Sequence, residues 1–308
     1  MYDLVTLGEI LIDFTPDTPA PGGFRRYIQN PGGAVVNVAA TFAKYGARAG
    51  FIGKVGQDLF GKYLSDYLTS LGVDCGGLQF DPEYHTTLAF VSLADNGDRD
   101  FAFSRKHEAD TRLTPEEIPY TMLENTRLFH FGSLSLTAEP ARSATYAALD
   151  YAKKAGALVS YDPNYRESLW AGEDYITYMR SVLDRVDFIK VSEEEGEMLT
   201  GEKAPEAIAD ALLAHGVRFA AVTLGEKGSY YAAKFCRGYA EPYKVKAIDT
   251  TGAGDVFFGT FLHEYLKKDV SLDDPEAVRS IVLRANKAAA LCTTRKGGAP
   301  SVPDYSEL

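Results

Sequence analysis

A regular alternation between residues 128 and 224 limits this chain to few folds. Short apolar runs alternate there with longer segments whose apolar residues recur every three to four positions. The pattern predicts strands at 128–134, 158–162, 187–191 and 219–224, helices at 140–155, 173–184 and 205–215, and a short acidic helix after residue 191. It is typical of an α/β protein with a doubly wound, mainly parallel sheet flanked by helices, because parallel strands need the long crossover that a helix supplies.

Polar clusters follow three of these predicted strands, at 162–166, 190–195 and 223–228. The carboxyl ends of parallel strands meet at one edge of the sheet, where such proteins bind their ligands. Packing does not explain several polar clusters at one edge, so we expect a binding site there.

A different pattern occupies residues 86–105. Two alternating segments, 86–93 and 99–105, flank Asp95-Asn96-Gly97-Asp98, a sequence typical of a tight hairpin turn. We interpret them, with residues near 10–30, as a small β-sheet lid outside the parallel sheet. We expect one α/β domain over residues 1–308, with the lid inserted from about 10–30 and 84–107. The lid exposes strand edges that a second copy can cover, so a homodimer through the lid is also expected.

Residues 249–255, Asp-Thr-Thr-Gly-Ala-Gly-Asp, precede a predicted helix. A Gly-rich turn that opens a helix presents free backbone N–H groups at the positive end of the helix dipole, which favours an anion such as phosphate. Asp255 lies at the mouth of this helix, where a carboxylate beside an anion site can serve as a proton acceptor. Taken alone, the motif is explained better by a helix-capping Asp and a structural turn.

A second Gly-rich helix start occurs at Gly32 and Gly33. Asn37 lies one turn into that helix, where its amide can both donate to and accept from a polyol. Asp13 lies in an otherwise apolar segment, and a buried carboxylate needs donors, which sugar hydroxyls can supply. At this point a salt-bridged or turn-capping Asp13 is an equal alternative.

The composition excludes several classes of function. A net charge of −11 argues against nucleic acid as a partner, and no apolar run reaches the roughly 18 residues of a membrane span. The first residues lack a signal-peptide pattern, and the three cysteines lack metal-binding spacing, so a reduced, cytoplasmic setting is expected. The sequence contains no P-loop, no protein-kinase motif set and no GxGxxG after a strand.

Together, the Gly32-Gly33-(x3)-Asn37 and 249–255 sequences resemble the two signatures of the PfkB, or ribokinase-like, carbohydrate kinases. The resemblance covers essentially the whole chain, and it implies a ribokinase-like fold and transfer of a phosphoryl group from ATP, with Mg²⁺, to a primary hydroxyl of a sugar. It implies that Asp255 is the base and that Gly252, Ala253 and Gly254 form the anion hole. The residues that it assigns to the sugar hydroxyls are Asp13, Gly32, Gly33 and Asn37.

The resemblance also implies a nucleotide site along the strand ends. The family's NxxE motif, associated with Mg²⁺, departs here to Ser192 in place of Asn, while Glu195 keeps the acidic position. The other nucleotide-binding candidates are Lys190, Thr223, Gly225, Gly228 and Asn286. Asp249 and Thr251 fit positions that bind a monovalent cation such as K⁺ in many relatives.

Two segments bear on the identity of the sugar. Residues 101–110 and 162–170 resemble fructokinases and 2-keto-3-deoxygluconate kinases, and they contribute the substrate-binding candidates Arg105, Asn164 and Arg166. A keto acid would favour paired Arg side chains on its carboxylate, whereas the Ser192 variant and the Leu169-Trp170 ending favour fructose.

We therefore expect an ATP-dependent kinase of a ketose, with fructose as substrate. The alternatives are a 2-keto-3-deoxygluconate kinase, a kinase of a sugar phosphate, and a catalytically silent sugar- or nucleotide-sensing protein. The acidic chain offers few cations for a sugar phosphate, and the intact 252–255 sequence counts against a silent protein. Sugar and ATP are the expected partners, with no nucleic acid and no membrane.

Overall fold

The structure, a computed structural model, describes residues 1–17, 22–93, 99–104, 108–170, 172 and 174–308. The strands are β1 (Leu4–Leu7), β2 (Leu11–Pro16), β3 (Tyr27–Gly32), β4 (Ala49–Gly56), β5 (Asp74–Asp81), β6 (Leu88–Leu93), β7 (Arg99–Ser104), β8 (Leu128–Gly132), β9 (Leu158–Asp162), β10 (Phe188–Ser192), β11 (Phe219–Thr223), β12 (Ser229–Ala233) and β13 (Arg237–Ala240). The α-helices are α1 (Ala34–Lys44), α2 (Leu59–Ser70), α3 (Tyr120–Glu124), α4 (Ala141–Lys154), α5 (Tyr175–Arg180), α6 (Glu193–Thr200), α7 (Pro205–Ala214), α8 (Ala253–Lys268) and α9 (Pro275–Cys292).

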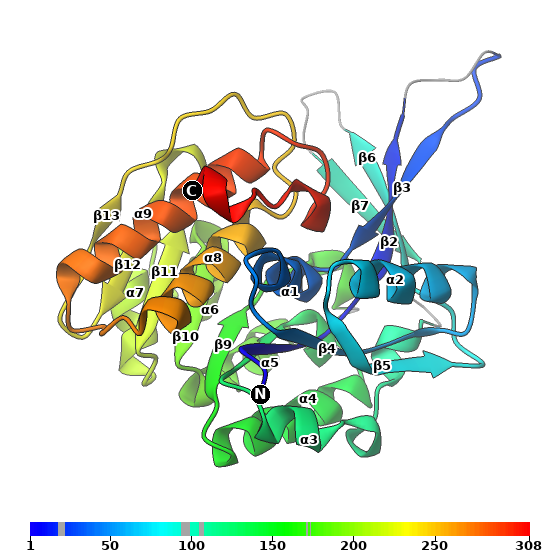
Figure 1. Ribbon diagram of the computed structural model, residues 1–308, viewed down its shortest axis with the longest axis horizontal. Helices are drawn as coiled ribbons and strands as arrows, with labels where there is room; N and C mark the ends of the chain where they lie inside the picture. Colours follow the sequence, from blue (N-terminus) through cyan, green and yellow to red (C-terminus); the bar gives the residue numbers. More distant parts are fainter. Residues whose placement is uncertain (18–21, 94–98, 105–107, 171, 173) are drawn as a thin grey trace.

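The larger sheet has nine strands within the described residues, in the order β13-β12-β11-β10-β9-β8-β1-β4-β5 (Figure 1). Neighbours from β11 to β5 run parallel, and β12 and β13 are antiparallel additions at one edge. This architecture confirms the predicted fold class. The chain builds outward from β1 through β4 to β5 and then returns to place β8 on the other side of β1. The order therefore reverses at β1, where doubly wound proteins bind ligands.

Helices cover both faces of this sheet because its strands are apolar on both faces. On β8, Phe129 and Phe131 join the core beneath α4 and α7, whereas Leu128 joins the core beneath α1, α8 and α9. Phe188 of β10 packs on the second face against Phe261 of α8, with ring centroids 6.3 Å apart and the rings tilted. The packing of α8 on this face places its N-terminus at the carboxyl edge of the sheet.

The smaller sheet has the strand order β3-β2-β6-β7 and projects beside α2, away from the main sheet (Figure 1). Its β2–β3 and β6–β7 pairs are antiparallel, and β2 pairs with β6 in parallel. The predicted turn at 95–98 lies outside the described residues. The division into one domain over 1–308 with an inserted lid stays a prediction.

One predicted helix was wrong, and strand β5 was not predicted. The helix predicted at 173–184 is only α5 followed by a 3₁₀ turn at Leu183–Arg185. Side chains compete with the helix there, because the Ser181 hydroxyl donates to the Tyr178 carbonyl and Arg185 donates to the Ser181 carbonyl. Strand β5 was missed because it contains Gly76 and Gly77, which are poor strand formers, and pairing with β4 provides its stability. No α-helix in the described part of the chain is long and apolar enough to cross a membrane.

Candidate active site

A cavity of about 470 Å³ lies at the carboxyl edge of the main sheet, between the N-termini of α1 and α8. It brings together most of the site residues predicted from the sequence. These are Asp13, Gly33, Asn37, Asn164, Arg166, Lys190, Ser192, Glu195, Thr251, Gly252, Ala253, Gly254 and Asp255. Other residues that line it were not predicted: Glu9, Leu11, Ala34, Phe103, Leu134 and Thr250.

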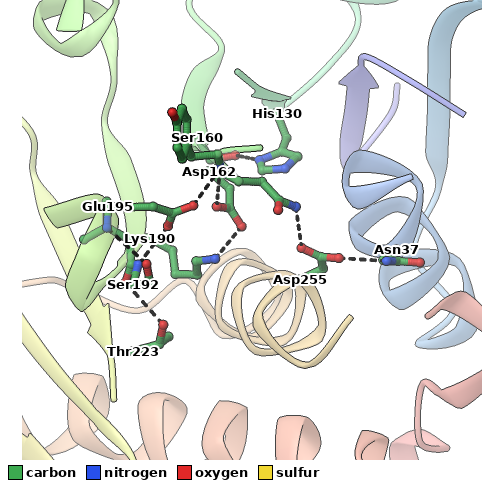
Figure 2. A network of polar contacts seen from close by, with 12 residues as sticks. Asn37, His130, Ser160, Asp162, Lys190, Ser192, Glu195, Thr223 and Asp255 are labelled. Carbon is green, nitrogen blue, oxygen red and sulfur yellow. Dashed lines mark hydrogen bonds and ion pairs between the residues drawn. The ribbon is translucent and has the colours of Figure 1, made fainter. Parts of the chain in front are cut away.

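Asp255 lies in the first turn of α8, which begins after Gly252 in a left-handed conformation with φ of 77°. Its side chain is 7% exposed. Asn37 Nδ2 donates to Asp255 Oδ2 at 2.7 Å, and Asn164 Nδ2 donates to Oδ1 at 3.4 Å (Figure 2). Two amides from different elements therefore orient one carboxylate toward the cavity.

Two glycines approach the Asn37 amide closely. A Cβ added at Gly298 would lie 2.5 Å from Asn37 Oδ1, and one at Gly252 would lie 3.2 Å from Asn37 Nδ2. Asn37 is 4% exposed, and its Oδ1 has no hydrogen-bond partner among the described residues. A buried acceptor without a partner indicates a place for a ligand hydroxyl. Gly298 was not among the site residues predicted from the sequence.

A buried ion pair lies beside Asp255. Lys190 Nζ is 2.8 Å from Asp162 Oδ2, and the two residues are 6% and 1% exposed (Figure 2). A Cβ added at Gly254 would lie 3.0 Å from Lys190 Nζ, so the amine lies against the 252–254 turn. Burial opposes the charge of Lys190, but Asp162, Glu195 and Asp255 together raise its pKa above the usual value. Lys190 is therefore a fixed positive charge at the predicted phosphate position.

The same environment changes the proton affinity of Asp255. Burial and the nearby Asp162 raise the pKa of Asp255 to about 6, against the opposing effects of Lys190, Asn37 and Arg166. A base with a pKa near the working pH combines the ionised form with useful proton affinity. Burial and the charge of Lys190 lower the pKa of His130 to about 3, so of these two groups Asp255 is the one that titrates near neutral pH.

We expect the kcat/KM of the protein to fall on the acid side with a midpoint near pH 6, because Asp255 must be ionised to accept a proton. Below the midpoint, kcat/KM should fall about tenfold for each pH unit. The measurement is kcat/KM for the acceptor substrate against pH, with a coupled assay checked at each pH. A flat profile from pH 5 to 8 contradicts a base with a raised pKa.

Ser192 and Glu195 form a capping box at the start of α6. Glu195 N donates to Ser192 Oγ at 3.1 Å, and Ser192 N donates to Glu195 Oε2 at 2.8 Å. Tyr165 N donates to the other oxygen, Glu195 Oε1, at 2.8 Å. Glu195 thus joins the segment after β9, which carries Asn164 and Arg166, to the start of α6.

The other nucleotide-binding candidates lie outside the cavity wall. Thr223 Oγ1 donates to the Val191 carbonyl at 3.2 Å, at the end of β10. Gly225 and Gly228 have positive φ, and a Cβ at Gly228 would lie 2.3 Å from the Ala240 carbonyl oxygen. These residues shape the loop after β11 without facing Asp255.

Asn286 connects α9 to the β12–β13 edge. Its Oδ1 accepts from Ser229 Oγ at 3.1 Å, and its Nδ2 donates to the carbonyls of Ala240 and Glu241, both at 3.1 Å. The protein itself therefore engages both ends of this amide. The segment that Asn286 holds continues to Ile248, whose side chain is exposed at 60% of its surface.

Asp249 organises two loops. Its Oδ1 accepts from Thr251 N at 2.8 Å and its Oδ2 accepts from Gly297 N at 3.1 Å. No group of three or more His, Cys, Asp or Glu side chains suited to a metal occurs in the part of the chain that the structure describes. A cation at Asp249 and Thr251 would therefore depend on backbone carbonyls.

The lid side of the cavity contains Asp13. A Cβ at Gly32 would lie 2.2 Å from Asp13 Oδ2, so only glycine fits beside this carboxylate. Arg105, another predicted substrate-binding residue of the lid, lies outside the described residues.

The fold and the cavity together define a phosphotransferase for a small hydroxylated substrate, since a carboxylate with a raised pKa, a buried cation and a Gly-rich helix start meet at the switch point of the sheet. Residues 1–305 match the profile of the pfkB family carbohydrate kinases. Probable fructokinase-4 of Arabidopsis thaliana is 42% identical over 313 residues, covering 99% of this chain and 95% of that protein. The chain therefore belongs to the pfkB family of carbohydrate kinases.

Solved structures agree with this assignment. A fructokinase from Xylella fastidiosa with bound ATP has a TM-score of 0.91 and 30% identity, covering 100% of this chain and 97% of that one. A fructokinase from Vibrio cholerae O395 with bound fructose, ADP and calcium ion has a TM-score of 0.88 and 34% identity, covering 99% and 97%.

Proposed function

We propose that the protein is an ATP-dependent fructokinase. The observation that carries this proposal is the position of Asp255, whose carboxylate lies between the sugar-side amides of Asn37 and Asn164 and the fixed charge of Lys190. The relatives named as fructokinases support fructose as the acceptor.

On the sugar side, Asn37 Oδ1 is the acceptor for one hydroxyl of the ketose, because it is buried and has no partner among the described residues. Asp13 and Asn164 supply further polar groups of the kind that a neutral sugar requires. Asp255 accepts the proton of the primary hydroxyl as the oxygen attacks phosphorus. The new O–P bond forms as the bond to the leaving diphosphate breaks.

On the nucleotide side, Lys190 and the 252–254 turn stabilise the charge of the transferred phosphoryl group. Gly225, which is exposed in the loop after β11, and the exposed Ile248 provide an open surface for the nucleoside. Glu195, which lines the cavity, would hold Mg²⁺ through water, and the ion would neutralise part of the phosphate charge of ATP. A K⁺ site at Asp249 and Thr251 is part of the proposal.

The smaller sheet is the proposed lid. Leu11 and Asp13 of β2 and Phe103 of β7 line the cavity, so movement of this sheet toward α8 would exclude water from the reaction. Tyr27 and Ile28 of β3 are both 41% exposed. A second copy that covers this edge would remove apolar surface from water, which supports a homodimer through the lid.

A panel of acceptors tests the proposed function. With ATP and Mg²⁺, we expect phosphorylation of fructose with kcat/KM at least about a hundredfold above that of 2-keto-3-deoxygluconate, ribose or nucleosides, because a site built to bond specific hydroxyls rejects analogues that leave its groups unpaired. Arg166 in the cavity is the observation that favours the keto acid as the second candidate. Turnover of the keto acid alone overturns the choice of sugar, and absence of turnover with every acceptor favours a silent sensor.

A further inference from the structure

Glu9 is a buried acid with no role in the steps above. It follows β1 after Gly8, is 4% exposed and lines the cavity. Its Oε1 accepts a hydrogen bond of 2.8 Å from the backbone N–H of Ala34, the first residue of α1. Because the two residues are 25 positions apart, this contact exists only in the folded protein.

The start of α1 has no local cap. The N-cap residue is Gly33, which makes no side-chain cap hydrogen bond, and the first turn contains no acidic residue. The backbone of Gly33 has φ of 125°, and a Cβ there would lie 2.5 Å from the carbonyl oxygen of Glu9. Glu9, in the segment after β1, therefore supplies both the acceptor and the packing surface that fix the start of this helix.

The position of this helix start determines the contact with Asp255. Asn37 lies one turn further along α1, and its Nδ2 is 2.7 Å from Asp255 Oδ2. A displacement of α1 by a few tenths of an ångström lengthens this bond.

We propose that Glu9 is a positioning residue of the phosphoryl-transfer reaction: by capping α1, it holds Asn37 against the carboxylate of Asp255. The inference rests on the proposed function, in which Asp255 is the base. Asn37 stabilises the ionised form of Asp255, so a loosened contact makes the base harder to ionise.

Other groups also set the proton affinity of Asp255, and the Glu9 substitutions leave them in place. Those that act on it or contact it are Asp162 of β9, Asn164 and Arg166 of the following segment, Lys190 of β10 and Cys292 of α9. Burial raises the pKa of the Cys292 thiol to about 11, so it stays neutral over the range of the test.

The experiment compares Glu9→Ala with Glu9→Gln. The Gln side chain keeps an acceptor oxygen at the same distance, whereas Ala removes it. We expect the acid limb of the kcat/KM–pH profile to move up by about one pH unit in Glu9→Ala, and to stay at the wild-type position in Glu9→Gln. Glu9→Asp, whose side chain is one methylene shorter, should shift the acid limb in the same direction by a smaller amount. If Glu9→Ala does not fold, Glu9→Asp replaces it in the comparison with Glu9→Gln.

Thermal unfolding of each variant separates positioning from stability. A folded Glu9→Ala variant that melts earlier but keeps the wild-type acid limb overturns the proposal, since Glu9 would then be only structural. A Glu9→Gln variant as impaired as Glu9→Ala also overturns it, because the carboxylate charge and not the cap would matter. A wild-type protein that does not phosphorylate fructose contradicts the proposed function instead, so the two failures are distinguishable.

Discussion

Replacing Asp255 with Asn is expected to lower kcat for fructose phosphorylation about a thousandfold, because general-base catalysis of this kind contributes factors of about 10²–10⁴. Asn has the same shape and still offers an oxygen to the amide of Asn37, whose Nδ2 lies 2.7 Å from Asp255 Oδ2. Fructose binding, measured by calorimetry, should therefore change little. Turnover in Asp255→Asn close to that of the wild type would remove Asp255 from the role of base.

The stability of this variant provides an independent check. The folded pKa of Asp255, about 6, lies above the unfolded value. Because the pKa is higher in the folded protein, Asp255 makes its full contribution to the free energy of unfolding below about pH 3.9, the unfolded pKa. This contribution is lost as the pH rises through the folded pKa. Asp255→Asn should thus be at least as stable as the wild type at pH 7. Asp273→Asn, at an exposed loop position, is the control for the loss of one charge.

Lys190→Met is expected to lower kcat by about 10²–10³-fold, because a fixed charge at the transferring phosphoryl group acts mainly in the transition state. It should also move the acid limb to higher pH, since Lys190 favours ionisation of Asp255. Steady-state kinetics with ATP and fructose varied separately measure both effects. A rise in the KM for ATP with unchanged kcat would restrict Lys190 to ground-state binding.

The stability of Lys190→Met shows whether the variant loses turnover through misfolding or through the missing charge. The substitution leaves Asp162 buried without its partner, and breaking a buried pair costs about 3–5 kcal/mol. Neutralising both residues, in Lys190→Met/Asp162→Asn, should recover much of the stability in urea denaturation but not the turnover. Lys153→Met is the matched control, because Lys153 pairs with Asp187 at 3.1 Å away from the cavity and is partly exposed. Recovery of turnover in the double variant would show that the single variant failed by misfolding.

Local patterns were sufficient where one segment determines its own structure. Strand β9 begins and ends at the predicted residues, because it is a short apolar run followed by polar residues. The Gly-rich starts of α1 and α8 were recognised for the same reason, since positive φ at Gly33 and Gly252 requires glycine. The prediction of α5 was wrong because spacing alone cannot show that Ser181 and Arg185 would bond the helix carbonyls.

The sequence by itself determined the alternating α/β architecture, the family resemblance and the candidate base Asp255, since each of these rests on short-range patterns. Only the tertiary structure decided how the site is supported. Asp162 with Lys190, Glu9 with Ala34, and Gly298 with Asn37 are contacts between segments far apart in the chain. Such contacts depend on strand order and helix packing, which no local spacing encodes, and they set the proton affinity of Asp255 and the orientation of the groups around it.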